Sequence, residues 1–151
     1  MRKKRSIRAR APAASSPTVR HVMQRNTGHE TDPERRLRSA LHRLGLRFRK
    51  DVRPEPNLRI SADIVFPRQK ICIFVDGCFW HGCPLHFETP KTHSAWWREK
   101  ILDNKARDAR QSNQLRAYGW TVKRYWEHEL RASDLTALCS RIERVVRTKR
   151  D

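Results

Sequence analysis

Residues 60–75 read Ile-Ser-Ala-Asp-Ile-Val-Phe-Pro-Arg-Gln-Lys-Ile-Cys-Ile-Phe-Val, and this stretch decides the fold. Two runs rich in β-branched and aromatic residues, Ile60–Phe66 and Lys70–Val75, flank a Pro-Arg-Gln turn. This pattern predicts a β-hairpin. Asp63 interrupts the apolar character of the first run. Because a charge in a buried strand is costly unless it is paired or bound to a metal, Asp63 is a candidate functional residue.

Further helices and strands are expected on both sides of this hairpin. Before it, Thr31-Asp-Pro-Glu34 predicts a helix start with a capping box, and Gly45 predicts the end of that helix. The other expected elements are a strand near 48–52, a helix over 94–118 with a break near 103–104, a strand over 120–126, and a last helix capped by Ser133. This order predicts an α/β fold with a central mixed β-sheet flanked by helices.

The charge of the chain points to a polyanionic partner. Lys and Arg number 34 against 16 acidic residues, and eight of these bases fall in residues 1–25, which contain no acid. We expect a disordered basic tail over residues 1–24, where apolar content is low, and one compact domain over 25–151. Because that domain also carries an excess of bases, nucleic acid is favoured over a membrane surface. No apolar run has spanning length and no signal peptide is visible, so we expect a cytoplasmic, nucleoid-associated protein.

Residues 76–86, Asp-Gly-Cys-Phe-Trp-His-Gly-Cys-Pro-Leu-His, have neither helical nor strand periodicity, so something other than a local core must hold them. Cys78, Cys83 and His86 are close enough in sequence to bind one tetrahedral ion, and His128 is the best-placed fourth ligand. The alternative is that the cysteines are small buried residues and the histidines lie on the surface. A disulfide is less favoured because nothing signals secretion. We predict a structural Zn²⁺ site.

Motifs spread over residues 22–130 resemble those of the very-short-patch-repair (Vsr) mismatch endonucleases. These motifs are Gly77-Cys-Phe-Trp-His81 after the strand that carries Asp63, Trp96-Trp-Arg-Glu-Lys-Ile101, and Arg124-Tyr-Trp-Glu-His-Glu-Leu130. The resemblance implies a restriction-endonuclease-like core and a Mg²⁺-dependent endonuclease. Such an enzyme nicks double-stranded DNA beside the thymine of a T:G mismatch, which arises from deaminated 5-methylcytosine, and so starts very short patch repair. We also expect a monomer, with mismatch-repair factors as partners.

The resemblance also implies roles for individual residues. Asp63 and the backbone carbonyl of Val75 match the Mg²⁺ ligands, and His81 matches the histidine that acts in the phosphodiester step, as general base for the attacking water. The family has threonine at the position of Val75, so valine keeps the carbonyl and loses the hydroxyl. Glu34 matches a further active-site acid, although its capping role could explain it. The spacing alone leaves His81 open as a zinc ligand, because it lies between the two cysteines of the loop.

Phe79, Trp80 and Trp97 match family residues that insert beside the mismatch. Such wedges unstack base steps at a cost of a few kcal/mol per step, and a mismatched base is cheaper to open. The alternative is that these rings are core residues.

Two other functions of the protein stay open. One is a Vsr-like homing or restriction-type nuclease that cuts matched DNA, and the other is a zinc-stabilised DNA-binding module without catalysis. The adjacent aromatic residues favour mismatched DNA.

Overall fold

The computed structural model describes residues 12–14, 17 and 31–149, so most of the predicted tail, residues 1–24, lies outside the described residues. In chain order the elements are α2 (Asp32–Arg43), β1 (Arg49–Val52), β2 (Ala62–Phe66), β3 (Ile71–Asp76), α3 (Ser94–Ala117), β4 (Thr121–Trp126), α4 (Glu127–Arg131) and α5 (Thr136–Thr148). The predicted order of helix, three strands, helix, strand and helix is confirmed. The short helix α4 was not predicted.

The strands form one mixed sheet in the order β1-β2-β3-β4. β2 and β3 form the predicted antiparallel hairpin, and β1 pairs antiparallel with β2. β4 pairs parallel with β3, so that Phe74 lies opposite Arg124 and Asp76 lies opposite Trp126. A parallel pair needs a long crossover connection, and here α3 provides it. The predicted α/β class with a mixed sheet is therefore confirmed.

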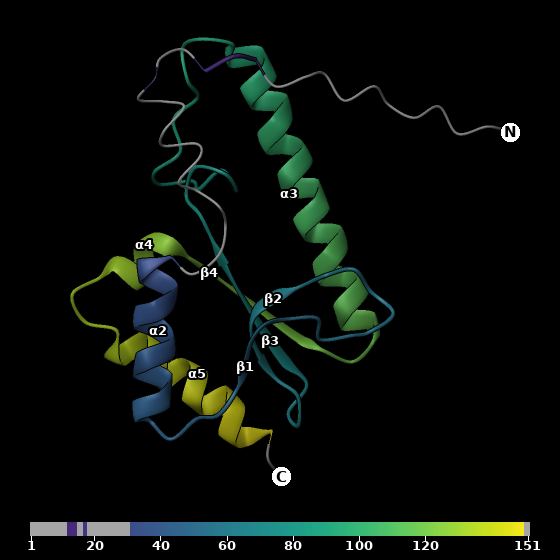
Figure 1. Cartoon of the computed structure of the whole chain (residues 1–151), viewed down its shortest axis with the longest axis vertical. Coiled ribbons are helices and arrows are strands. Elements are labelled where there is room, and N and C mark those ends of the chain that lie inside the picture. Colours follow the sequence, from purple (N-terminus) through teal and green to yellow (C-terminus); the bar gives the residue numbers. More distant parts are fainter. Residues whose placement is uncertain (1–11, 15–16, 18–30, 150–151) are drawn as a thin grey trace, which may run out of the picture.

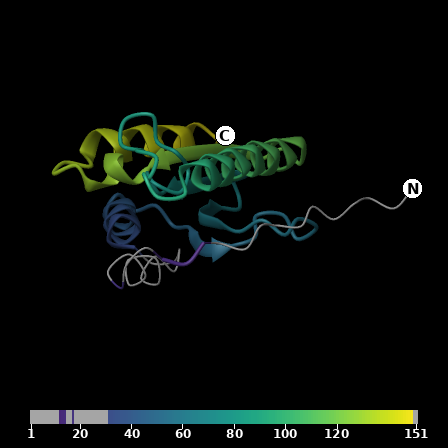
Figure 2. The ribbon, with the colours of Figure 1, turned by 90° about the horizontal axis from the view of Figure 1, so that it is seen from above.

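Both faces of the sheet are covered by helices, α2 and α5 on one side and α3 on the other (Figure 1). Seen from above, α3 and α5 lie on either side of β4 (Figure 2). Successive strand residues point to opposite faces. Ile64 and Phe66 therefore pack against α2 and α5, whereas Val65 packs in the core beneath α3. None of the helices in the described part of the chain is both long and apolar enough to cross a membrane.

Two local predictions were wrong. α3 runs without a break through residues 103–104, because Asn104 turns inward and its side-chain amide finds a partner outside the helix. Ser133 does not cap the last helix; instead the Asp134 carboxylate accepts a hydrogen bond of 2.7 Å from the Thr136 N–H. At the two ends of β4, Trp120 is buried, whereas Trp126 is half-buried and stacks beside His128.

The main core makes a prediction for stability. Leu41 on α2 is 0% exposed and belongs to the core between α2, α5 and the sheet. Leu41→Ala should lower the free energy of unfolding by about 2–5 kcal/mol, because it removes buried apolar surface and leaves a cavity. Leu102→Ala is the matched control on α3, where the leucine is 66% exposed, and should change it by about 0.5 kcal/mol or less. Urea unfolding measures both, and equal losses would contradict this core.

Candidate active site and metal centre

The four predicted zinc ligands lie together. The Sγ atom of Cys78 is 3.2 Å from Nδ1 of His128, and Sγ of Cys83 is 3.6 Å from Nδ1 of both His86 and His128. One ligand atom from each of the four residues lies within 4.8 Å of the others. In a tetrahedral zinc site with ordinary bond lengths, neighbouring ligand atoms are roughly 3.5 Å apart. The donor set and spacing of this Cys/His cluster therefore fit a closed zinc site.

The loop that follows β3 also docks against α3. Gly82 has a φ of +63°, and a Cβ atom there would lie 2.6 Å from Cγ2 of Ile101, so only glycine allows this close approach. The side chain of Asn104 donates a 2.8 Å hydrogen bond to the Trp80 carbonyl. At the start of the loop, the Cys78 N–H donates to Oε1 of Glu127 over 3.1 Å. The loop is thus fixed from α3 and from α4 as well as by the Cys/His cluster.

The three predicted wedge residues form one aromatic cluster. The Phe79 ring lies 5.2 Å from the rings of both Trp80 and Trp97, and the two indoles are 5.9 Å apart. Phe79 and Trp80 are half-buried, whereas Trp97 is 7% exposed. Trp97 is therefore the buried member of this aromatic cluster, and it packs against the two more accessible rings.

Asp63 lies in a cluster of three carboxylates. Oxygens of Glu34, Asp51 and Asp63 lie within 4.8 Å of one another, and we call these residues the carboxylate cluster. The Val75 N–H donates a 2.6 Å hydrogen bond to Oδ2 of Asp63. Burial, together with the charges of Glu34, Asp51 and Asp76, raises the pKa of Asp63 from 3.8 to about 6 against the opposing effect of that hydrogen bond. Closely spaced carboxylate oxygens are suitable ligands for a hard divalent cation.

The Glu34 carboxylate is buried at the first turn of α2. The Thr31 side chain makes no cap hydrogen bond to the helix, so the predicted capping box is incomplete. Burial raises the pKa of Glu34 although hydrogen bonds from Thr31 lower it. The residue is 5% exposed, and its Oε2 atom is buried with no hydrogen-bond partner within the described residues. A buried carboxylate oxygen without a donor is a reason to expect a cation in the carboxylate cluster.

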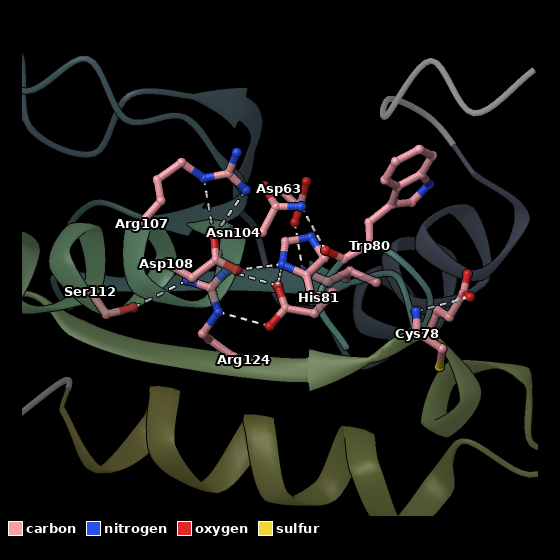
Figure 3. A network of polar contacts seen from close by, with 12 residues as sticks. Asp63, Cys78, Trp80, His81, Asn104, Arg107, Asp108, Ser112 and Arg124 are labelled. Atoms are coloured by element: carbon pink, nitrogen blue, oxygen red, sulfur yellow. Dashed lines mark hydrogen bonds and ion pairs between the residues drawn. The ribbon is translucent and has the colours of Figure 1, made fainter. Parts of the chain in front are cut away.

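His81 belongs to a different group from the Cys/His cluster. Its Nδ1 atom lies 2.5 Å from Oδ2 of Asp108 and 3.7 Å from Oδ1 of Asp76. Arg124 donates to both oxygens of Asp76 and also lies 3.6 Å from Asp108 (Figure 3). We call these four residues the His81 network. Burial raises the pKa of Asp108, but the hydrogen bond and charge of His81, with Arg124 and Arg107, hold it below its ordinary value.

The carboxylate cluster and the His81 network adjoin each other. The charge of Asp76 acts on Asp63, and the charge of Asp63 acts on Arg124. Figure 3 shows Asp63 beside the network. The strand aspartate and the loop histidine that the sequence singled out are therefore brought together at one site, where a cation and a base can act on the same ligand.

Sequence reasoning missed Asp51, Asp108 and Arg124. A usable signal existed for Asp108. The polar residues Asn104, Asp108 and Ser112 recur every four positions on α3, between the buried anchors Ile101 and Leu115. Polar residues spaced in this way share one helix face. A polar stripe on the inner face of a helix predicts a buried polar site beneath it.

Comparison with known proteins fits this arrangement. A family profile described as DNA mismatch endonuclease Vsr matches residues 15–86, which include Asp63 and the loop with His81. The DNA mismatch endonuclease Vsr of Escherichia coli K12 is 38% identical over 136 residues, covering 87% of this chain and 82% of that relative. The chain belongs to the Vsr family.

Two nicking enzymes are also similar over most of this chain. A type II nicking enzyme of Xanthomonas oryzae, V.XorIIP, is 41% identical over 84% of this chain and 90% of its own length. Another, V.NaeI of Lentzea aerocolonigenes, is 45% identical over 71% of this chain and 66% of its own length. The Vsr-family chain described here is accordingly a DNA endonuclease of the Vsr type.

The raised pKa of Asp63 makes a prediction about pH. Because this pKa lies above that of the unfolded chain, the folded state binds more protons between about pH 4 and 6, and stability falls as the pH rises through that window. Asp63→Asn removes the charge and keeps an acceptor for the Val75 N–H. In EDTA it should raise the Tm at pH 7.5, and the gain should vanish near pH 4. Thermal unfolding across pH measures this, and a gain independent of pH would argue against the cause given.

Proposed function

We propose that this chain is a Mg²⁺-dependent endonuclease with a restriction-endonuclease-like core that nicks one strand beside the thymine of a T:G mismatch. The observation that carries the proposal is the juxtaposition of Asp63, in the carboxylate cluster, with His81, whose Nδ1 is engaged by Asp108. The mixed sheet, with its antiparallel hairpin carrying Asp63, supports the proposed core. The names of the relatives as nicking enzymes support cleavage of a single strand.

Asp63 and the main-chain carbonyl of Val75 would hold the Mg²⁺ ion, with Glu34 and Asp51 adding negative charge beside it. The unpartnered buried oxygen of Glu34 and the three clustered carboxylates fit a hard cation. When bound, Mg²⁺ supplies positive charge that stabilises the phosphate in the transition state. Because only the carbonyl of Val75 is used, the absence of the family's threonine hydroxyl leaves this ligand intact.

His81 acts as the general base. With its Nδ1–H donated to the ionised Asp108, Nε2 is the basic nitrogen. The Nε2 atom takes a proton from the attacking water as the water oxygen bonds to phosphorus and the bond from phosphorus to the leaving sugar oxygen breaks. The His81 side chain is 21% exposed, so a phosphate can reach it. The leaving oxygen takes its proton from solvent.

The mismatch specificity is assigned to the aromatic cluster. Phe79 and Trp80, whose rings are half-buried, directly follow Cys78 in the sequence. The loop that carries residues of the Cys/His cluster therefore also carries the two rings proposed to insert into DNA. Insertion of these rings, with Trp97 in support, unstacks a weakly paired T:G step at lower cost than a matched step. A monomer and stimulation by mismatch-repair factors rest on the family resemblance.

The central test is a nicking assay on labelled duplexes with and without one T:G mismatch, in Mg²⁺ or in EDTA. The wild-type protein should nick the mismatched duplex in Mg²⁺ only. Asp63→Ala should reduce the rate by about 10³-fold or more, because it removes the charged ligand of the cation. Asp103→Ala, which removes an exposed acid on α3, is the matched control and should nick at nearly the wild-type rate.

The same assay separates the alternatives. Equal rates on matched and mismatched duplexes would contradict the proposed mismatch specificity and would support a nuclease that acts on matched DNA. Binding without any cleavage would support the non-catalytic DNA-binding module. Cleavage that persists in EDTA would rule out the metal dependence.

Zinc in the Cys/His cluster is tested by metal analysis. We propose that Cys78, Cys83, His86 and His128 bind one Zn²⁺ ion, which stabilises the loop. Cys83→Ser should lose near-stoichiometric zinc and unfold at a lower temperature. Cys139→Ser, which changes a buried cysteine of α5 outside the cluster, should keep its zinc. Full zinc content in Cys83→Ser would refute this ligand set.

A further inference from the structure

Arg124 occupies an unusual place for an arginine. It lies on β4, and its side chain is only 22% exposed. Its guanidinium carbon is 4.6 Å from the ring centroid of Phe74, the residue opposite it on β3. Because the planar guanidinium stacks on this buried ring, the side chain keeps its charge while its flat face is covered by apolar surface.

Each of the three nitrogens of the same guanidinium makes a hydrogen bond or an ion pair. Nε and Nη2 donate to the two oxygens of Asp76, each over 2.8 Å, which is the bidentate arrangement. Nη1 donates to Oγ of the buried Ser112 over 3.1 Å, and Nη2 lies 3.6 Å from Oδ1 of Asp108. Arg124 is therefore held by β3 on one side and by α3 on the other (Figure 3).

Both carboxylates that Arg124 contacts also face the imidazole of His81. Asp108 lies closer to Nδ1, at 2.5 Å, and Asp76 lies farther away, at 3.7 Å. Two carboxylates near one ring nitrogen can compete for it, and they also repel each other. Arg124 occupies both oxygens of Asp76 and thereby leaves Asp108 as the hydrogen-bond partner of His81.

We propose that Arg124 is a positioning residue of the active site, which holds Asp76 and Asp108 in the arrangement that directs Nδ1 of His81 to Asp108 and Nε2 to the substrate phosphate. This inference rests on the proposed role of His81 as general base. This role depends on the planar, fork-shaped guanidinium of arginine. Two of its nitrogens donate to the two oxygens of Asp76, and the third donates to Ser112. A lysine ammonium provides the charge without the fork.

The first test is single-turnover cleavage of the duplex that the wild-type protein nicks. Arg124→Gln should lower the rate constant by roughly 100-fold, the order of loss that follows from a misplaced catalytic group. Its reaction amplitude, zinc content and affinity for the duplex in EDTA should stay at wild-type levels. Arg124→Lys should recover part of the rate. Arg147→Gln, which removes an ion-paired arginine on α5, is the control and should cleave like the wild type.

A double variant tests the link to Asp76. If Arg124 acts by occupying that carboxylate, then Asp76→Asn introduced into Arg124→Gln should recover part of the lost rate, because the competing charge is gone. Independent, multiplying losses would contradict the proposed coupling. A fall in amplitude or zinc content with an unchanged rate constant would show that Arg124 serves only folding.

An independent readout comes from the ¹⁵N chemical shifts of the His81 imidazole, assigned by comparison with His81→Gln. The wild type should show the form with the proton on Nδ1, and Arg124→Gln should show a mixture of the two tautomers. A spectrum unchanged by Arg124→Gln, together with a cleavage rate within about twofold of the wild type, would overturn the proposal. If the wild-type protein cleaves no duplex, the proposed function fails, while the tautomer measurement still decides whether Arg124 orients His81.

Discussion

The parallel pairing of β3 with β4 sets the positions of the side chains at the candidate site. In its register Phe74 lies opposite Arg124, and the same offset of 50 residues continues past the strand ends to Cys78 and His128, whose Sγ and Nδ1 atoms are 3.2 Å apart. One ladder of backbone hydrogen bonds thus places Arg124 beside the carboxylates near His81, and it brings together two residues of the Cys/His cluster from distant segments. A shift of one residue would turn these side chains to the opposite face.

This arrangement concentrates acidic side chains, those of the carboxylate cluster and the His81 network, at one site of a strongly basic protein. Arginines lie beside both groups of acids. Arg38 lies 3.6 Å from Asp51 in the carboxylate cluster, whereas Arg124 binds Asp76 and Arg107 lies 3.2 Å from Asp108 in the His81 network. Burial and, after it, the charges of Glu34, Asp51 and Asp76 raise the pKa of Asp63, so the arginines do not cancel the effect of the neighbouring acids. Such a site attracts a cation, whereas the formal net charge of +18 attracts DNA. In the proposed reaction, the acidic site would bind the cation and the basic surface would bind the DNA.

The local patterns predicted the elements well and their details less well. The run of β-branched and aromatic residues over Ile60–Phe66 predicted a strand, because such side chains favour an extended, pleated backbone. The break expected near Asn104 was wrong because the side-chain amide donates to the Trp80 carbonyl, a contact with a segment outside the helix. Helix α4 was missed because five residues are too few to show helical periodicity.

The sequence by itself determined the α/β order of elements, the loop that carries Cys78 and His81, and the excess of positive charge, because each depends on residue types and on local spacing. Only the tertiary structure decided which residues meet. It separated His81 from the cysteines beside it in sequence, and it added Asp108 and Arg124 to the site. The physical reason is that hydrogen bonds and ion pairs between side chains depend on distances of a few ångströms across elements far apart in the chain, which sheet register and helix packing set.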